Sequence, residues 1–364
     1  MRRPRILIFS LAYFPFVGGA EVAVKEITDR LADKFEFEVI NADIKNFWSK
    51  YLYPIWACRR AVRQHRTKNY DLVWAIMANQ AGMAATLFKR RPQWDTPRGV
   101  PFSTLPFLLT LQEGDDLDSL AYRARLLGPR LFGVFRRADH ITAISHYLAR
   151  WARQMGARCS ITVVPNGVNI EKFEVRGEKL NRKEKIIITT SRLVKKNGVD
   201  VLIEAMRFLP ENIRLVIVGS GPEESFLKQL TSRLNLDKRV EFLGAVSPIQ
   251  IPDCLGRADV FCRPARSEGL GNSFLEAMAA GVPVVGTPVG GIPDFLKDGK
   301  TGWFCEVNNP QSIADKVQYI LDPANIEKVA EVKEEAKRLV EEKYNWNTIA
   351  QEMAQIMDNL AKKS

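Results

Sequence analysis

The feature that most constrains the fold of this chain is an alternation of short apolar runs with stretches of helical periodicity, which occurs twice along the chain. In the first half the apolar runs fall at 5–11, 37–41, 71–76, 107–111, 140–144 and 160–164. In the second half they fall at 186–190, 214–218, 240–243, 259–262 and 282–285. Strands and helices that alternate in this way pack as a mostly parallel sheet with helices on its faces. We therefore expect an α/β protein with two such sheets.

The length of the chain agrees with two domains, because 364 residues are enough for two separate cores. We predict an N-terminal Rossmann-like domain over 1–176 and a C-terminal Rossmann-like domain over 186–342, which face each other across a cleft. The polar, aperiodic stretch 174–185 is the expected linker. A closing helix is expected within 343–364, where apolar residues recur at helical spacing.

Composition narrows the classes of protein that the chain can belong to. Hydrophobic residues make up 46% and charged residues 26%, which is an ordinary globular balance. No run approaches the roughly 18 apolar residues that a membrane-spanning helix needs. The five cysteines form no CxxC pair and are widely spaced, which favours a reducing compartment. We expect a cytoplasmic protein.

The net charge of the chain is unevenly distributed. Residues 1–176 contain 27 Lys and Arg against 16 Asp and Glu, a net charge of +11, whereas 177–364 balance 26 against 26. Such a field attracts anionic lipid surfaces, phosphorylated small molecules or nucleic acid. No nucleic-acid-binding motif accompanies the charge, so nucleic acid is not an expected partner. The charge is compatible with a peripheral position on the inner face of the cell membrane.

Two glutamates, Glu268 and Glu276, flank a glycine-rich turn that follows the apolar run 259–262. Ligands of doubly wound sheets bind at the carboxyl ends of the strands, so both carboxylates are expected to face the ligand. Carboxylates accept hydrogen bonds from neighbouring hydroxyls of a polyol. The helix start nearby offers free backbone N–H groups, at Gly271, Asn272 and Ser273. The alternative is that Ser273-x-x-Glu276 is a capping box and that Glu276 only caps the helix.

A second group of residues is suited to a diphosphate. Arg192 follows the run 186–190, where its guanidinium can bind phosphate as a fork of several donors. Gly18 and Gly19 precede a helix and permit backbone N–H groups to approach a ligand closely. Gly219 is expected to serve a tight turn first. The amides of Gly290 and Gly291 are expected at the rim of the same site, as an anion nest.

Six motifs in order resemble the glycosyltransferase family 4 group, a family with the GT-B fold, over nearly the whole chain. The residues that carry the resemblance are Gly18-Gly19-Ala20-Glu21, Pro165-Asn166-Gly167-Val168-Asn169, Ser191-Arg192-Leu193, Gly219-Ser220-Gly221-Pro222, the paired glutamates and the run from Gly281 to Gly291. The resemblance implies transfer of a hexosyl group from a nucleotide sugar, with a UDP- or GDP-sugar as donor, retention of configuration and no metal. It implies that Glu276 holds the ribose hydroxyls and that Glu268 contacts the transferred sugar.

The sequence departs from the family pattern at the expected phosphate-binding lysine. The family places this lysine directly before a glycine, and here Asn197 precedes Gly198. Either Lys196 takes the phosphate role after a small backbone shift, or Arg192 carries more of it alone. The alternative is that Lys195 and Lys196 form a solvated turn.

The acceptor side is less well defined by the sequence. Glu113 and Asp115 follow the run 107–111 and are expected to face the cleft from the N-terminal domain, and His146 near a helix start is a further candidate. Many relatives have a histidine near position 112, so the acceptor chemistry stays open. Asp116 and Asp118 match a DxD metal-binding pattern, but this pattern is common by chance and we expect no metal site.

The stretch 51–66 combines aromatic side chains with four arginines. A basic amphipathic helix of this kind can lie on an anionic membrane surface. It can equally be a Rossmann helix that packs Ile55, Cys58 and Val62 on the sheet, since both require the same pattern. Both interpretations stay open.

These observations predict a metal-independent glycosyltransferase that acts on a glycan or a lipid-linked acceptor. Arg192 and Lys196 would neutralise the charge of the departing diphosphate, and Glu268 would act on the sugar. The alternatives are a nucleotide-sugar epimerase or a phosphorylase on the same architecture, and a non-catalytic protein that binds sugar nucleotides. A phosphorylase would need a longer chain and a pyridoxal lysine.

Overall fold

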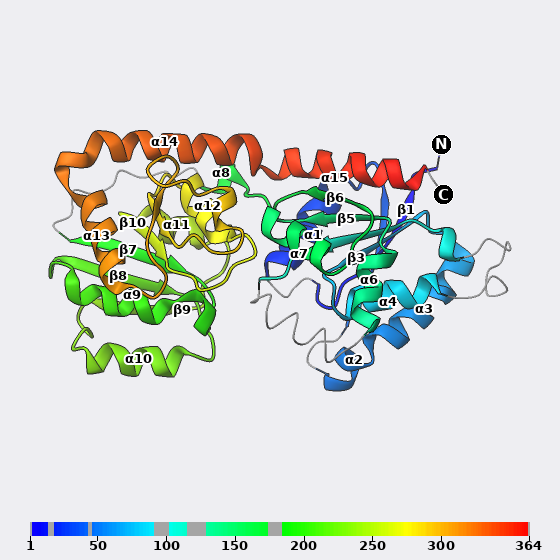
Figure 1. Cartoon of the computed structure of the whole chain (residues 1–364), viewed down its shortest axis with the longest axis horizontal. Coiled ribbons are helices and arrows are strands. Elements are labelled where there is room, and N and C mark those ends of the chain that lie inside the picture. The colour runs from blue at the N-terminus through cyan, green and yellow to red at the C-terminus, as the bar shows by residue number, and fades with distance from the viewer. Residues whose placement is uncertain are drawn as a thin grey trace. The chain divides into compact units, whose positions relative to one another are not determined.

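Contacts in the computed structural model divide the chain into two units, each built around a parallel sheet (Figure 1). Unit 1 comprises Met1–Asn166 and Trp346–Ser364, and unit 2 comprises Gly167–Asn345. The structure describes residues 2–13, 18–42, 46–90, 102–114, 129–173 and 184–362. Within these residues each unit contains a six-stranded sheet. The predicted α/β class with two sheets is confirmed.

Unit 1 has the strand order β2-β1-β3-β4-β5-β6, and every neighbouring pair is parallel. Its strands are β1 (Arg5–Phe9), β2 (Glu36–Ile40), β3 (Leu72–Ile76), β4 (Phe107–Leu111), β5 (His140–Ala143) and β6 (Ser160–Val163). Its helices are α1 (Gly19–Arg30), α2 (Phe47–Tyr51), α3 (Tyr53–Lys68), α4 (Gln80–Lys89), η2 (Phe102–Thr104), α6 (Pro129–Arg137), α7 (His146–Gln154) and α15 (Trp346–Ala361).

Alternate residues of the unit 1 strands pack on opposite faces of the sheet, because successive side chains of a strand point to opposite sides. Ile6 and Ile8 of β1 belong to a core with α1 and α15. Phe9 instead contacts Phe88 of α4, which packs beside α3. Burying a large apolar side chain contributes about 2 kcal/mol. The C-terminal helix therefore completes unit 1, and Met353 and Met357 are among its buried residues.

Unit 2 has the strand order β12-β11-β10-β7-β8-β9, again with parallel neighbours. Its strands are β7 (Lys185–Thr190), β8 (Ile213–Val218), β9 (Val240–Gly244), β10 (Val260–Arg263), β11 (Val284–Gly286) and β12 (Trp303–Phe304). Its helices are α8 (Ile170–Phe173), η3 (Lys195–Asn197), α9 (Val199–Ala205), η4 (Met206–Phe208), α10 (Glu224–Arg233), α11 (Ile251–Gly256), α12 (Asn272–Ala279), η5 (Ile292–Asp294), α13 (Pro310–Leu321), η6 (Pro323–Asn325) and α14 (Ile326–Lys343).

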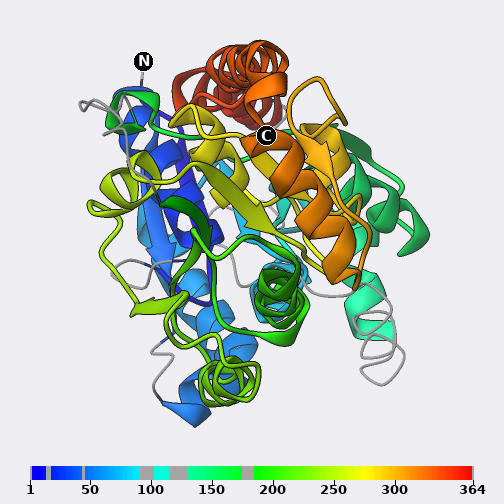
Figure 2. The ribbon, with the colours of Figure 1, turned by 90° about the vertical axis from the view of Figure 1, so that its left-hand side faces the viewer.

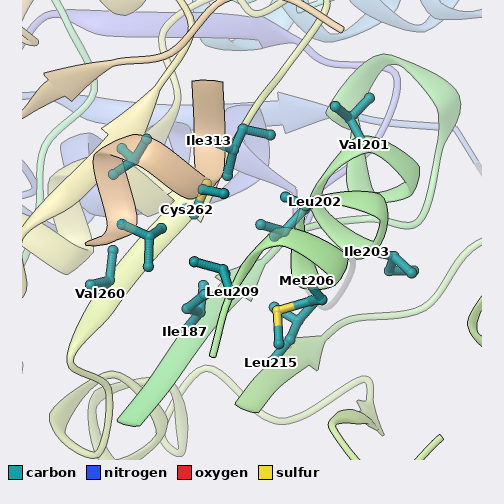
Figure 3. Packing of buried hydrophobic residues seen from close by; sticks show 14 of the residues in the cluster. Ile187, Val201, Leu202, Ile203, Met206, Leu209, Leu215, Val260, Cys262 and Ile313 are labelled. Atoms are coloured by element: carbon teal, nitrogen blue, oxygen red, sulfur yellow. The ribbon is translucent and has the colours of Figure 1, made fainter. Parts of the chain in front are cut away.

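The core of unit 2 follows from the same alternation. α9 packs against α10 and α13, and both views show α9 beside α10 (Figure 1, Figure 2). Leu202 of α9 lies in one cluster with Ile187 of β7 and Cys262 of β10 (Figure 3). Phe261, the strand neighbour of Cys262, contacts Phe274 of α12 instead. Strand β10 is thus buried on both faces, and this is why its first three residues, 260–262, are all apolar.

No helix in the described part of the chain has the length and apolar character needed to cross a bilayer. Each apolar run seen in the sequence corresponds to a strand, and β1, β3, β4 and β10 are buried at nearly every position. Run 107–111 coincides with β4, and the ends of the others differ by up to two residues. Helix and strand ends differ by this much between criteria.

Candidate functional site

The strand order of unit 2 places two loops together at the carboxyl ends of neighbouring strands. β7 pairs with β8 on one side and with β10 on the other, so the connections leave in opposite directions from β7 and β10. Such a switch point is where ligands bind in open α/β sheets. The loop after β7 runs over 191–198 and contains Arg192 and Lys196, and the loop after β10 runs over 264–271 and contains Glu268. The residues proposed for donor chemistry therefore share one end of the unit 2 sheet.

Arg266 clamps these two loops together. Its backbone N–H donates to the carbonyl of Lys196 at 2.6 Å, and its Nη1 donates to the carbonyl of Lys195 at 2.6 Å. The two terminal guanidinium nitrogens, Nη1 and Nη2, also donate to the Asp200 carboxylate, at 2.8 and 2.7 Å. Nε donates to Asn308 Oδ1 at 2.7 Å. Planar, bidentate pairs of this kind fix geometry as well as charge, so the clamp positions the loop that carries Lys196.

Two further loops approach so closely that only glycine fits. A Cβ atom on Gly219, after β8, would lie 1.9 Å from the Ser191 carbonyl oxygen. A Cβ atom on Gly290, after β11, would lie 1.8 Å from the Glu268 carbonyl oxygen, and the φ angle there is +57°. The N–H of Gly291 donates to the same carbonyl at 3.0 Å. The loops after β7, β8, β10 and β11 therefore meet at one end of the sheet with backbone against backbone.

A buried arginine, Arg263, ends strand β10 directly below this set of loops. Its side chain is 7% exposed and pairs with the Glu268 carboxylate, which is 15% exposed. Nη1 donates to Ser273 Oγ at 2.9 Å, and the guanidinium lies over the Phe274 ring at 4.8 Å from its centroid. The other Glu268 oxygen accepts from the N–H of Gly269 at 2.9 Å. Glu268 is thus held in one orientation, with lone pairs left to accept from a ligand hydroxyl.

Glu276 lies one helical turn into α12, and its carboxyl group sits in a desolvated environment although part of the residue stays exposed. Desolvation raises the pKa of Glu276 to about 7, and the charge of Arg263 opposes this shift. Near neutral pH the group is therefore shared between its two protonation states. A hydrogen-bond donor from a ligand would favour the ionised state.

The start of α12 excludes the capping-box alternative. The N-cap residue is Gly271, in the left-handed conformation with φ +104°, and no side chain caps the helix. Ser273 is the second helical residue, and its hydroxyl accepts from Arg263. Glu276 is consequently not placed to complete a capping box with Ser273. Asn272 begins the helix and is half-buried.

The loop after β7 shows how the departure from the family pattern is accommodated. Asn197 is buried, and its side-chain Nδ2 donates to the Arg192 carbonyl at 2.7 Å. Its side chain therefore serves the loop itself. Arg192 is exposed and Lys196 is half-buried, so both cations stay near the surface of the site.

Three successive hydroxyls at the end of β7 are buried without a partner in the described structure. These are the hydroxyls of Thr189, Thr190 and Ser191, and Nε of Arg263 has the same status. Buried polar groups are normally hydrogen-bonded, so each such group calls for a water or a ligand. Their position at the switch point agrees with a polar ligand there.

The remaining predicted site residues lie in unit 1. Gly18 caps α1 in extended conformation and Gly19 begins that helix. Glu113 is buried, and its two carboxylate oxygens accept from the N–H groups of Ala78 at 2.7 Å and Gln112 at 2.9 Å. Both carboxylate oxygens of Glu113 therefore bind backbone N–H groups of unit 1. His146 begins α7 and is exposed. Asp115 lies outside the described residues.

Among the residues that the structure describes, no group of three or more His, Cys, Asp or Glu side chains could hold a metal ion. Asp116 and Asp118 of the DxD pattern lie outside the described ranges. The absence of a metal requirement stays a prediction.

Sequence reasoning missed Arg263, the residue that organises the paired-glutamate loop. The sequence did contain a signal for Arg263, because this charged residue stands directly at the end of an otherwise apolar strand. A charge at that place is buried only if it is paired, and Glu268 is the pairing group. Arg266 was missed for a different reason, because its partner Asp200 is remote in sequence.

A doubly wound sheet with a preorganised polar site at its switch point defines a ligand-binding α/β protein. Comparisons with known proteins give the family of such proteins to which the chain is similar. The model of glycosyl transferases group 1 matches residues 171–339, and that of glycosyltransferase family 4 matches residues 17–172. The two models together match residues 17–339, so the chain belongs to glycosyltransferase family 4, and its fold is of the GT-B type.

Individual relatives agree with this assignment. The putative colanic acid biosynthesis glycosyltransferase WcaL of Escherichia coli (strain K12) is 32% identical over 64% of this chain and 59% of that protein. The GDP-mannose-dependent alpha-(1-6)-phosphatidylinositol monomannoside mannosyltransferase of Mycobacterium tuberculosis (strain CDC 1551) is 30% identical over 60% of this chain and 61% of that protein. Both matches span less than two thirds of the relative.

A solved structure shows the same fold over the whole chain. HepE of Anabaena, in complex with UDP and glucose, is 19% identical, has a TM-score of 0.80 and covers 98% of this chain and 100% of its own. At this identity the likeness shows the fold alone.

Proposed function

We propose that the chain transfers a hexosyl group from a nucleoside diphosphate sugar to a glycan or a lipid-linked acceptor, without a metal and with retention of configuration. The observation that carries this proposal is the arrangement of unit 2, in which four loops meet at the switch point around two glutamates of different environment. Glu268 is held by Arg263, and Glu276 is desolvated. A sugar nucleotide offers diols for both carboxylates and a diphosphate for the neighbouring cations.

The donor is a UDP- or a GDP-sugar. The solved HepE complex contains UDP and glucose, and the mycobacterial relative is described as GDP-mannose-dependent. These two names support a nucleoside diphosphate sugar and leave the base open. The resemblance to the family supports Glu276 as the acceptor of hydrogen bonds from the ribose hydroxyls.

The chemistry of the step is a departure of the nucleoside diphosphate while the acceptor oxygen bonds to the anomeric carbon. Negative charge grows on the leaving phosphate, and Arg192 and Lys196 would neutralise it together with the amide of Gly290. The N–H of Gly291, which the sequence also suggested for this anion nest, donates to the Glu268 carbonyl instead. The Arg266 clamp would keep Lys196 at that place. The leaving phosphate would accept the proton of the attacking hydroxyl, and Glu268 would bind the transferred sugar.

The first experiment is a thermal-shift screen of the purified chain with UDP, GDP, ADP and their sugars, because a ligand of the native state raises the apparent stability. We expect one nucleotide to raise the melting temperature, with no change when EDTA is added. Glu276→Gln should lose most of this shift. Loss of the shift on addition of EDTA would contradict metal independence.

The second experiment separates the enzyme from its alternatives. The donor that binds is incubated with a mixture of glycan and lipid-linked acceptors, and nucleotide release and product configuration are followed by NMR. Transfer with retention supports the proposal. A changed sugar still bound to its nucleotide would show an epimerase, and binding without turnover over the whole acceptor set would favour a non-catalytic binder.

A further inference from the structure

Four large apolar side chains are exposed close together at the junction of α2 and α3. Their exposed fractions are 69% for Trp48, 56% for Tyr51, 47% for Leu52 and 51% for Ile55. We call these four residues the apolar tip. The other exposed large apolar residues of the described chain are distributed over both units, at Leu87, Phe208, Phe226, Leu243, Ile249, Val307, Tyr319 and Ile326. Scattered apolar residues are normal, whereas four within residues 48–55 form a patch that indicates a partner.

An arginine row continues from the apolar tip along α3. Arg59, Arg63 and Arg66 are exposed, and at 100° per residue they lie within about 80° of Ile55 around the helix. The opposite side of α3 is buried, through residues that include Ala57 and Ala61, and α3 packs beside α4 (Figure 1). Both interpretations of this stretch from sequence are thus compatible, because the helix packs on unit 1 and still presents a basic face.

The segment that carries the apolar tip and the arginine row has one sign of charge. Residues 46–68 contain six Lys and Arg and no Asp or Glu. Lys68 pairs with Glu38 of β2, but no ion pair is formed by Arg59 or Arg63 with any residue that the structure describes. A partner that satisfies this surface must combine an apolar layer with fixed negative charge.

We propose that the apolar tip and the arginine row dock this chain on an anionic lipid bilayer. Trp and Tyr are favoured at the boundary between headgroups and acyl chains, and Leu52 and Ile55 would lie just below them. The arginine row would then lie along the headgroup phosphates, with each cation adding attraction to an anionic surface. A lipid-linked acceptor in the same bilayer would be brought to the enzyme.

Two other occupants fit the surface less well. A second copy of the chain in a two-fold interface would place the arginine row against itself, which costs free energy through like-charge contact. Single-stranded nucleic acid binds platforms in which aromatic residues stack with the bases along a cationic groove. Here the apolar side chains include two aliphatic ones and stand at one end of the cations, as insertion into a bilayer requires.

The test is co-sedimentation of the full chain with vesicles of phosphatidylcholine alone and of phosphatidylcholine mixed with phosphatidylserine. No sugar nucleotide is added, so the result does not depend on the proposed donor or acceptor. We expect binding to the mixed vesicles only, weakened by salt. Arg59→Gln with Arg63→Gln should weaken the partition coefficient roughly thirty-fold, and Trp48→Ser with Ile55→Ser should weaken it as well.

The matched control is Arg207→Gln with Arg233→Gln, which removes two exposed arginines of unit 2. Its net charge equals that of the Arg59→Gln, Arg63→Gln variant. We expect it to bind vesicles like the unchanged chain, and all three variants to melt like it. Equal losses in both arginine variants would show a net-charge effect and overturn the proposal. So would a dimer that Trp48→Ser dissociates, or a single-stranded DNA that binds more tightly than the vesicles and depends on Arg59 and Arg63.

Discussion

Unit 1 and unit 2 share an architecture and differ in where they keep their charged groups. Each has a six-stranded parallel sheet, with a switch point between β1 and β3 in unit 1 and between β7 and β10 in unit 2. In unit 2 a buried arginine and its glutamate stand at the switch point. In unit 1 charged groups lie on the surface of α3, where all four arginines are exposed.

The loops at the carboxyl ends of the two sheets are also held by different means. In unit 1 the reciprocal amide pair of Gln112 and Asn166, with both distances 2.9 Å, joins the end of β4 to the segment after β6. In unit 2 the loops are joined by the ion pairs of Arg263 and Arg266 and by backbone contact at glycines. The comparison teaches that one fold can carry a rigid, charged ligand site in one copy and a charged outer surface in the other.

The largest expected effect is the loss of the buried cation of unit 2. Arg263→Met would leave Glu268 nearly buried without its partner, which should lower the free energy of unfolding by about 3–5 kcal/mol. Arg2→Met is the matched control in unit 1, since Arg2 pairs with Asp71 at the surface with 49% of its side chain exposed. That change should cost less than about 1 kcal/mol. Urea titration of each variant measures both values, and equal losses would refute the distinction between the units.

The second effect is a dependence of stability on pH that arises in unit 2. The pKa of Glu276 is raised from 4.5 to about 7 in the folded chain. Between these values the folded state keeps a proton that the unfolded state releases, so this group lowers stability as pH rises from 4.5 to 7. Glu276→Gln removes the titration.

We therefore expect the stability of Glu276→Gln, relative to the unchanged chain, to increase by at most about 3 kcal/mol between pH 5 and pH 8. Binding of the nucleotide to the unchanged chain should become tighter over the same rise in pH, because the ionised carboxylate of Glu276 accepts hydrogen bonds from the ribose. Glu241→Gln, at an exposed position on β9, serves as control in the same urea titrations. An unchanged difference across this pH range would disprove the desolvated state of Glu276.

The third effect isolates the close backbone contact at the site. Gly290 and Gly299 both have positive φ angles, +57° and +67°, but a Cβ on Gly299 would meet nothing within 4 Å. Gly299→Ala should therefore cost only about 1 kcal/mol for the left-handed backbone. Gly290→Ala adds the clash with the Glu268 carbonyl and should cost about 2 kcal/mol more.

Thermal unfolding and steady-state kinetics of both variants give the comparison. We expect activity to fall only in Gly290→Ala, because the contact fixes the loop that carries Glu268. Equal stability of the two variants would mean that the loops after β10 and β11 are free to separate.

The smallest effect is expected in unit 1, where Glu113 binds two backbone N–H groups. Glu113→Gln keeps one carbonyl acceptor and turns an NH2 group toward the other N–H, so the free energy of unfolding should fall by about 1–2 kcal/mol. Glu113→Ala is a second variant that leaves both donors without their acceptor and should cost more. A large loss of turnover in Glu113→Gln at unchanged stability would instead place Glu113 in acceptor chemistry.

Much of the fold could be predicted from the sequence, because strand burial leaves a local record. The run 107–111 coincides with β4, a strand buried at every position. The two-residue strand β12 left no such record, because Trp303 and Phe304 are too few to show a period. Boundaries of elements moved by one or two residues, as at β1, which ends at Phe9 although the apolar run extends to position 11.

The candidate site was predictable only in part. The glutamates, Arg192 and the glycines belong to short motifs that are visible in the sequence. The Arg266–Asp200 clamp joins residues 66 positions apart, so no short motif contains it. The capping-box alternative for Glu276 was wrong because the N-cap residue of α12 is Gly271, with φ +104° and no side chain, whereas Ser273 lies inside the helix. Backbone conformation of this kind depends on what packs around the turn.

The sequence by itself determined the two parallel sheets, the family and the candidate residues, because periodicity and motif spacing are properties of neighbours along the chain. Only the tertiary structure decided that Arg263 orients Glu268, that desolvation raises the pKa of Glu276, and that the apolar tip is exposed. Burial and pairing depend on which distant segments come together. They appear only when the chain has folded.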